Sequence, residues 1–385
     1  MKTTRGLQRL AIGCVSIAAV AGLGAGFAGP ATAAPSVQQL TDTIKQGAKK
    51  PTKAAPKVQL QQQNGTANRS ITTNAVAGPF TVPDGTGSTA SDTSGVGPQQ
   101  TNFGNAFGYA ILNPNAAPPG ANDFGCKPKS GQRPVVLLHG TWENAYDNFA
   151  RISPDLKAAG YCTFTFNYGK LNITNGGGVI SLIPGANGTG DIPTSAGQVA
   201  TFVNRVLAAT GASKVDIVGH SQGGVLARQY LKFNGGASKV QKLITLGATN
   251  HGTTLLGIGS LGRSINNLGI DILGFAQLPV GISGIQQVVG SNFINNVNAG
   301  GDTLPGIDYT IIRTTYDEVT TPSESTFLTA GPGATVKNIT LQDGCPIDLS
   351  DHLSMSYSTR AISIIKNALN PASPVVCAKS GPLVN

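Results

Sequence analysis

The sequence predicts an α/β domain in which helices flank a mostly parallel central sheet. From about Thr101 onward, short apolar runs alternate with stretches whose apolar residues recur at helical spacing. Strands that alternate with helices pair in parallel, and helices then cover both faces of the sheet. A serine in the segment Gly219-His220-Ser221-Gln222-Gly223 also falls between a strand pattern and a helix pattern. The stretch 101–385 is long enough to form one such domain.

Six apolar runs are expected to form the strands of the sheet. The run at 134–139 is continuously apolar up to His139, and the run at 162–167 alternates as a half-buried strand does. Further strands are expected at 214–218, 240–246, 309–313 and 336–341. Helices are expected at 195–209, where Val199, Phe202, Val203, Val206 and Leu207 have helical spacing, and at 224–233.

The N-terminus has the features of a secretory signal peptide. A basic start (Lys2, Arg5, Arg9) precedes an apolar run from residue 10 to about 28, and small residues follow at 31–34. We expect residues 1–33 to be removed, because cleavage one residue later would leave Pro35 at the new terminus. A retained membrane anchor is the alternative, and the Gly- and Ala-rich, Leu-poor composition argues against it. The mature protein is therefore expected to be secreted, extracellular or associated with the cell envelope, with no transmembrane span.

Residues 34–100 are expected to form a low-complexity, flexible extension, because they hold few large apolar side chains. A propeptide is the alternative. The formal net charge of the chain is +9, and most of it lies before residue 101. The remaining positive charge is too weak and too scattered to favour nucleic-acid binding. The basic extension could instead contact an anionic envelope surface.

Four cysteines remain once Cys14 in the signal peptide is set aside. They are Cys126, Cys162, Cys345 and Cys377. An even number in an exported protein indicates two disulfides, although three pairings are possible. We favour pairing between sequence neighbours, 126 with 162 and 345 with 377. No spacing typical of a zinc site is present.

The segment 252–301 interrupts the alternation of strands and helices. It is apolar, Gly-rich and nearly uncharged, and 261, 265, 268, 272 and 275 place apolar side chains on one helix face. Arg263 and Asp271 argue against a transmembrane span. The segment is either an ordinary buried helix or a cap or lid that lines an acyl-binding cleft.

Ser221 is the candidate nucleophile. At a sharp strand-to-helix turn, the serine hydroxyl is exposed and the helix N-terminus is aimed at a developing oxyanion. The flanking glycines are expected because side chains at those positions would collide with the neighbouring strand and helix. The five-residue pattern also arises by chance. Its place between a strand and a helix is what indicates a nucleophile.

A serine hydroxyl needs a base, and the chain has four histidines. His352 is the expected base, because it lies late in the chain and the order Ser, Asp, His is the one used with this kind of turn. His139 is interpreted as a loop-shaping residue, and the side chain of His220 is expected to point away from the nucleophile. His251 is expected to support its loop through hydrogen bonds, and it is the second candidate base.

The acid that orients the base is expected to be Asp317, the first carboxylate after the strand at 309–313. Its neighbour Glu318 is interpreted as a solvated loop carboxylate. The carboxylates at 302 and 308 precede the strand and lie at its wrong end. Three more carboxylates near His352 are interpreted as surface groups, with a calcium site as the alternative: Asp343, Asp348 and Asp351.

Two backbone N–H groups are expected to bind the oxyanion. One is that of Gln222, directly after the nucleophile. The other is that of Thr141, in the loop after the first strand, and the Thr141 hydroxyl is a candidate third donor.

These segments resemble the bacterial class 2 lipases, which are extracellular triacylglycerol lipases of the α/β-hydrolase fold, and actinobacterial members are especially similar. The likeness covers about 105–370 and is carried by 136–141, 219–224, 246–252, Tyr316-Asp317 and His352. It implies a triad of Ser221, Asp317 and His352 with Thr141 and Gln222 as oxyanion donors, and an early disulfide of the Cys126–Cys162 kind. The extension before residue 100 and the segment 252–300 depart from the family pattern.

The resemblance implies a secreted serine ester hydrolase that cleaves acylglycerols or other lipidic esters through an acyl-enzyme on Ser221. No cofactor or metal is needed for this chemistry. The expected partner is a lipid or ester substrate at a lipid–water interface, and no nucleic acid. The alternatives are an acyltransferase or polyester hydrolase that uses the same residues, and a non-catalytic envelope-binding protein on the same scaffold.

Overall fold

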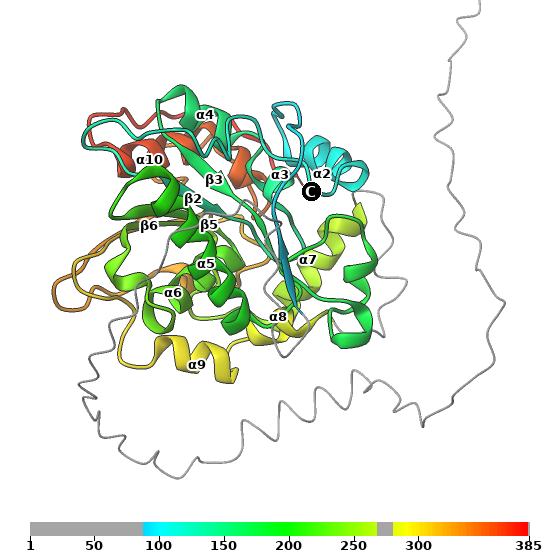
Figure 1. The fold of residues 1–385 in the computed structure, drawn as a ribbon. Coiled ribbons are helices and arrows are strands. Elements are labelled where there is room, and N and C mark those ends of the chain that lie inside the picture. Colours follow the sequence, from blue (N-terminus) through cyan, green and yellow to red (C-terminus); the bar gives the residue numbers. More distant parts are fainter. Residues whose placement is uncertain (1–87, 268–279, 384–385) are drawn as a thin grey trace, which may run out of the picture. The chain divides into compact units, whose positions relative to one another are not determined.

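The computed structural model describes residues 88–267 and 280–383 (Figure 1). The predicted signal peptide at 1–33 lies outside the described residues, as does the predicted extension up to residue 87. Three positions of the helix face predicted in the 252–301 segment (Leu268, Ile272 and Phe275) also lie outside them.

A six-stranded sheet forms the centre of the described domain (Figure 1). The strand order is β3-β2-β5-β6-β7-β8, and every neighbouring pair is parallel. The strands are β2 (Val135–Leu138), β3 (Thr163–Thr165), β5 (Val215–His220), β6 (Val240–Leu246), β7 (Asp308–Arg313) and β8 (Thr335–Thr340). All six predicted strands are confirmed. The side chains of β2 and β5 are buried throughout, which explains why these strands read as continuous apolar runs.

Helices cover both faces of the sheet. On one face, β2 contributes Val136 and Leu138 to an apolar cluster with α5 and α6; on the other, Val135 and Leu137 pack with α3, α4 and α10. This division follows from the alternation of side chains along a strand. The helices are α3 (Ala145–Phe149), α4 (Ile152–Ala158), α5 (Ile192–Thr210), α6 (Gln222–Phe233) and α10 (Thr359–Leu369). The predicted helices at 195–209 and 224–233 are confirmed as α5 and α6.

A third apolar cluster lies among the loops that follow β2 and β7. It joins α2 to Trp142, to Ile258 and Leu261 of α7, and to Leu353. The remaining helices are α2 (Phe103–Leu112), α7 (Leu255–Asn267), α8 (Ile282–Gln286) and α9 (Asn292–Asn298), with short 3₁₀ turns at Ile173–Asn175, Val179–Leu182, Gly236–Ser238, Ser323–Thr326 and Ser354–Tyr357. The segment 252–301 therefore does contain a helix, α7. Among the described helices, none is long and apolar enough to cross a membrane.

Residues 88–100 belong to the folded domain, so the predicted boundary at residue 100 is too late. Strand β1 (Thr89–Ser91) pairs antiparallel with β4 (Asn167–Lys170). Asp92 accepts two hydrogen bonds of 2.7 Å from Arg205 on α5. Backbone pairing and one ion pair hold this stretch in place, and it buries little apolar surface. A composition with few large apolar residues therefore predicts a flexible segment here, although the stretch is folded.

Both predicted disulfides are confirmed. Cys126 is bonded to Cys162 and Cys345 to Cys377. The first ties the segment before β2 to the start of β3, and the second ties the loop before His352 to the segment after α10.

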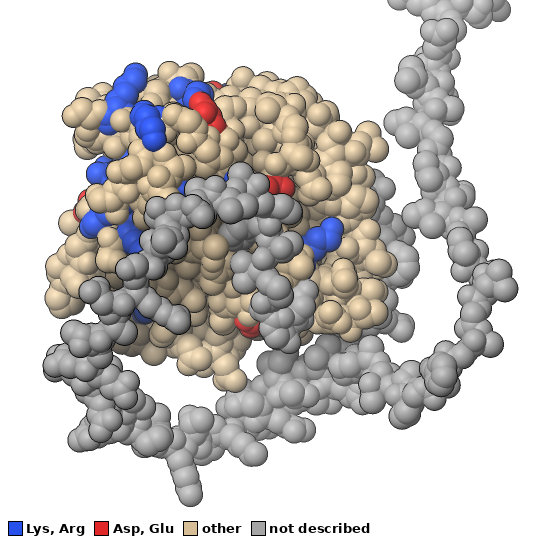
Figure 2. Space-filling model, viewed as in Figure 1, with Lys and Arg blue, Asp and Glu red and all other residues tan. Residues whose placement is uncertain are grey.

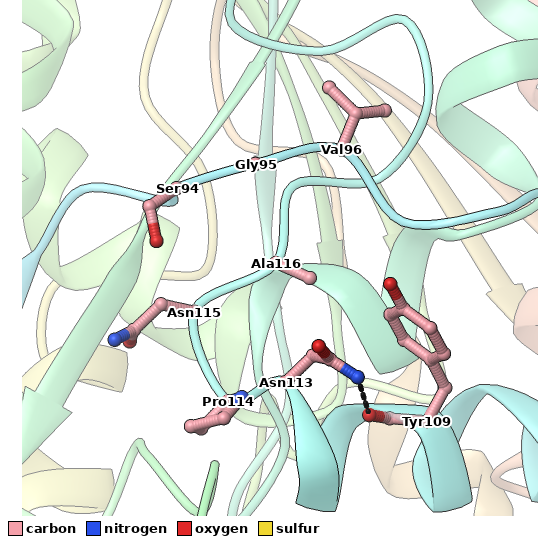
Figure 3. Close-up of a pocket in the computed structure, with 8 residues that line it drawn as sticks. All are labelled: Ser94, Gly95, Val96, Tyr109, Asn113, Pro114, Asn115 and Ala116. Atoms are coloured by element: carbon pink, nitrogen blue, oxygen red, sulfur yellow. Dashed lines mark hydrogen bonds between the residues drawn. The ribbon is translucent and has the colours of Figure 1, made fainter.

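The face drawn in Figure 2 is mostly uncharged, with most of its Lys and Arg side chains toward the left of the view and few Asp and Glu. A surface hollow is lined by Ser94–Val96 and by Tyr109 with Asn113–Ala116, and Figure 3 shows these residues. None of the predicted site residues lines this hollow.

Candidate active site

Ser221 occupies the turn between β5 and α6. Its backbone has φ 51° and ψ −124°, one of three positive-φ positions at residues other than glycine in the described part of the chain. Such a conformation is strained for a side chain with a Cβ and persists only where the surroundings enforce it. The Ser221 N–H donates to the carbonyl of Leu246 at 2.8 Å, which ties the turn to the end of β6. The sharp strand-to-helix turn expected from the sequence is present.

The glycines beside Ser221 allow the turn to pack against the sheet. A Cβ added at Gly223 would lie 2.1 Å from the carbonyl oxygen of Leu138 on β2, and one at Gly219 would lie 2.6 Å from the backbone of Gly223. Both obstacles are backbone atoms, which cannot rotate away as a side chain can. The collision expected from the sequence is therefore found in the structure.

We predict that Gly223→Ala lowers the free energy of unfolding by about 3 kcal/mol, because β2 and α6 must separate to accept the methyl group. Differential scanning calorimetry measures this loss. Gly197→Ala on α5 is the matched control: a Cβ there meets nothing within 4 Å, so its expected change is neutral or stabilising by up to about 1 kcal/mol. Equal unfolding free energies for the two variants would contradict the steric argument.

The structure brings Asp317 and His352 together. The Nδ1 atom of His352 lies 2.9 Å and 3.0 Å from the two carboxylate oxygens of Asp317. Asp317 Oδ1 also accepts the N–H groups of Val319 and Thr320, at 3.0 Å and 2.7 Å, which fix the carboxylate in the loop after β7. The two side chains are almost completely buried.

Backbone contacts place the turn at Ser221 beside this pair. The ring of His220 lies with its Nε2 2.9 Å from the carbonyl oxygen of His352. A Cβ added at Gly247, next to the Leu246 carbonyl that holds Ser221, would be 3.0 Å from Asp317 Oδ2 and 3.1 Å from His352 Nδ1. The Nε2 atom of His352 is buried and makes no hydrogen bond within the described residues, with Ser221 or with any other group.

The pKa of His352 is raised from 6.5 to about 9. Burial by itself lowers the pKa of this imidazole. Burial is the largest single effect, but four smaller effects together outweigh it: attraction to the Asp317 carboxylate, the hydrogen bond with it, and the charges of Glu318 and Glu143 all favour the protonated ring.

The other histidines have partners that match their predicted roles. His139 is buried, stacks on Tyr168 at 4.0 Å and contacts the carbonyl of Gly140, and burial lowers its pKa to about 4. His251 contacts the Ser325 carbonyl at 2.9 Å and Asp302 at 3.0 Å, so both of its ring nitrogens are engaged away from the pair at Asp317.

The predicted oxyanion donors lie on either side of the serine turn. A Cβ added at Gly140, directly before Thr141, would be 3.1 Å from the Cβ of Ser221, which places the two loops in contact. Thr141 and Gln222 are both buried, and in the described residues neither backbone N–H donates to another protein group. Two unpaired N–H groups that flank a serine can bind an oxyanion.

Gln287 is a site residue that the sequence analysis missed. Its side-chain amide donates to Thr141 Oγ1 at 2.8 Å, and the Gln222 amide donates to the same atom at 3.3 Å. Thr249 in turn donates to the carbonyl oxygen of the Gln287 side chain at 2.8 Å. Because amide nitrogens only donate, the Thr141 hydroxyl acts as an acceptor in both contacts, and its own hydrogen stays available.

The interpretation of three carboxylates near His352 needs correction. Glu318 is not freely solvated: it accepts the His352 N–H at 3.3 Å and the Ser264 hydroxyl of α7 at 3.3 Å, and burial raises its pKa. Asp348 and Asp351 are buried rather than on the surface. Serine hydroxyl and backbone N–H donors in the same loop satisfy them, so burial does not leave these charges unpaired: Ser350, Ser354 and Ser358. Asp343 is exposed, as expected.

The described residues hold no group of three or more His, Cys, Asp or Glu side chains arranged to bind a metal ion. The parallel sheet, the serine turn after its central strand and the chain order Ser, Asp, His are together those of an α/β-hydrolase fold.

A family model described as "Lipase (class 2)" matches residues 132–361, which is more than half of the chain. The chain belongs to the class 2 lipase family. Two curated triacylglycerol lipases, from Pseudarthrobacter phenanthrenivorans and Burkholderia plantarii, are each 34% identical to this class 2 lipase over 100 residues. Those residues are 25% of this chain and 27% and 24% of the two relatives, so the matched segment spans about a quarter of each relative's length.

Solved structures of lipases are also similar to this class 2 lipase. Aspergillus fumigatus lipase B has a TM-score of 0.48 and 22% identity, and the match covers 68% of this chain and 56% of that one. The mature form of Bacillus licheniformis lipase BlEst2 has a TM-score of 0.43 and 15% identity, with 63% and 94% covered.

Proposed function

We propose that this class 2 lipase hydrolyses carboxylic esters of lipids, acylglycerols among them, through an acyl-enzyme on Ser221. The observation that carries the proposal is the buried Asp317–His352 pair next to the strained turn at Ser221. A serine, an imidazole and a carboxylate in this chain order form the machinery of acyl transfer in α/β hydrolases.

In the first half-reaction, Ser221 Oγ attacks the ester carbonyl carbon while its proton passes to His352 Nε2. The Nε2 atom that lacks a partner is the one available for this proton, because Asp317 holds Nδ1. When the tetrahedral intermediate collapses, the bond between the carbonyl carbon and the alcohol oxygen breaks. The imidazolium then returns the proton to the leaving alcohol.

The second half-reaction uses the same groups. Water attacks the acyl carbon, gives a proton to His352 Nε2, and the ester bond to Ser221 breaks as the proton returns to Oγ. In both halves, the N–H groups of Thr141 and Gln222 stabilise the oxyanion. The Thr141 hydroxyl, oriented by the amide of Gln287, adds a third donor.

The family and the surroundings of the site both support the proposed substrate class. The apolar cluster that joins Trp142 to α7 lies among the loops that carry the site residues, and it favours an ester with a lipidic acyl chain over a small polar ester. The two disulfides support a location outside the cytoplasm, as proposed for a chain with a signal peptide at 1–33.

The test is a product analysis with the purified protein. Triacylglycerols and a series of p-nitrophenyl esters of increasing acyl length are supplied in water, then with an added alcohol acceptor, and finally a polyester film is tested. Release of free fatty acid with water as acceptor supports the lipase proposal. Transfer to the alcohol in preference to water, or release from the film alone, would replace the proposal with an acyltransferase or a polyester hydrolase.

The pH dependence of the reaction follows from the pKa of His352. The imidazole must be unprotonated to accept the serine proton, and its pKa is raised to about 9. We therefore predict that kcat/KM increases with pH and reaches half of its maximum near pH 9, where half of the imidazole is neutral. Stopped-assay rates between pH 5 and about 10.5 on a stable ester measure this profile. A midpoint at or below the ordinary histidine value of about 6.5 would contradict it.

A further inference from the structure

Glu143 is a buried carboxylate for which the proposed reaction has no use. It lies in the loop between Thr141 and α3 and is 3% exposed. Its Oε2 accepts the N–H of Gly140 at 2.7 Å and lies 3.0 Å from Nδ1 of His220. Its Oε1 is buried and makes no hydrogen bond within the described residues.

His220 extends these contacts to the main chain of the proposed base. Its Nε2 lies 2.9 Å from the carbonyl oxygen of His352. A carbonyl oxygen can only accept, so this nitrogen carries a hydrogen and donates it. The contacts therefore run from Gly140 through Glu143 and His220 to His352. They join the oxyanion loop, the residue before the nucleophile and the loop of the base.

Other side chains surround Glu143 and His220. The amide of Asn148 on α3 contacts the same two partners, with its oxygen 3.2 Å from the Gly140 nitrogen and its nitrogen 2.9 Å from His220 Nδ1. Charged or titratable groups of four elements and two loops face Glu143: Asp147, His139, His220, His352, Tyr168 and Tyr357.

The balance of these neighbours keeps Glu143 ionised. Burial raises the pKa of Glu143, but attraction to His220, the hydrogen bond with it and the charge of His352 together lower the pKa below its ordinary value. Burial and the charge of Glu143 raise the pKa of Asp147 well above its usual range. Buried ion pairs often contribute little net stability, so the contacts of Glu143 with the loops of the site are its more important feature.

We propose that Glu143 is a positioning residue for the proposed ester hydrolysis: through Gly140 and His220 it holds the oxyanion loop and the loop of His352 in one fixed arrangement. The inference rests on the proposed function. Small displacements of either loop would separate the oxyanion donor from the base, and such misplacement costs rate without necessarily weakening substrate binding.

Two variants separate the charge of Glu143 from its hydrogen bonds. Glu143→Gln keeps an acceptor for the Gly140 N–H and removes the charge, whereas Glu143→Ala removes both. We expect kcat for a p-nitrophenyl ester to fall about tenfold in Glu143→Gln and about 100-fold in Glu143→Ala, with KM within about twofold of the wild type. The midpoint of kcat/KM should move to lower pH by about half a unit in both variants, because a negative charge that favours protonated His352 is lost.

The matched control is Asp216→Asn. Asp216 is also a buried carboxylate, paired with Arg133 at 2.7 Å, but it lies at the opposite end of β5 from His220. This variant should lose stability and keep the wild-type pH midpoint. The concentration of active sites is measured by titration with a fluorophosphonate, and all rates are divided by it. A fraction of unfolded protein then does not lower the measured kcat.

The possible outcomes are distinct. A lower kcat and a lower pH midpoint in Glu143→Gln, with neither change in Asp216→Asn, support the role of Glu143. Wild-type kcat and an unchanged midpoint in a folded Glu143→Gln variant overturn it, whatever Glu143→Ala does. If the wild-type protein itself hydrolyses no ester, then the proposed function has failed rather than this inference.

Discussion

Ser221→Ala is expected to reduce kcat for p-nitrophenyl ester hydrolysis by about 10⁶-fold, because the covalent route through the acyl-enzyme is lost. Any residual rate would come from the oxyanion donors and from substrate binding alone. The fold should survive, since in the described structure Ser221 is held through its backbone N–H, which alanine retains. Steady-state kinetics with calorimetry on the same preparation measure both quantities.

A second buried serine, Ser283, provides the matched control for Ser221→Ala. Ser283 is also buried, and its hydroxyl donates to the carbonyl of Gly188. Ser283→Ala should therefore retain activity within about tenfold, with a loss of about 1 kcal/mol in unfolding free energy from the missing hydrogen bond. If Ser221→Ala that contains no wild-type enzyme still showed substantial ester turnover, Ser221 would not be the nucleophile.

Asp317→Asn is expected to lower kcat by about 10⁴-fold. The Asn oxygen can still accept the N–H groups of Val319 and Thr320, so the loop is preserved. The Asn amide nitrogen would then face His352 Nδ1 and donate to it. Donation at Nδ1 places the imidazole hydrogen on Nε2, the atom that must accept the serine proton, so the base is held in the wrong tautomer.

The fold offers a matched control for this substitution in its other His–Asp pair. Asp302 lies 3.0 Å from His251 and 3.6 Å from the buried Arg228. Asp302→Asn should lower stability, because Arg228 loses a charged partner, while kcat stays within about twofold of the wild type. If Asp317→Asn kept a tenth or more of the activity, Asp317 would not be the residue that orients the base.

Much of the fold could be predicted because its signals are local. The strands at 135–138 and 240–246 are buried on both faces or nearly so, and a continuous apolar run is what such burial requires. The pairing of Asp317 with His352 could be predicted from strand ends, because the carboxyl ends of parallel strands meet at one edge of the sheet. With only four histidines in the chain, few alternatives remained.

The missed features depend on contacts between distant segments. Gln287 reaches Thr141 from a different part of the chain, and nothing in its surrounding sequence indicates a polar role. Strand β1 lies in the stretch that composition predicts to be a flexible extension, because its pairing with β4 uses backbone groups and composition does not report backbone pairing. The burial of Asp348 had a weak signal in the serines at 350 and 358, whose hydroxyls bind its carboxylate. Serines close to an acidic residue are also typical of solvent-exposed loops, so this sequence pattern alone does not indicate burial.

The central claim, that Ser221 is made nucleophilic by His352, is tested most directly by covalent labelling. The purified wild-type protein and a His352→Ala variant are treated with a fluorophosphonate, and the adduct is located by peptide mass spectrometry. The account predicts one phosphonyl group on Ser221 in the wild type and a labelling rate at least about 10³-fold lower in His352→Ala. Labelling of another residue, or an equal rate on Ser221 in both proteins, would contradict it.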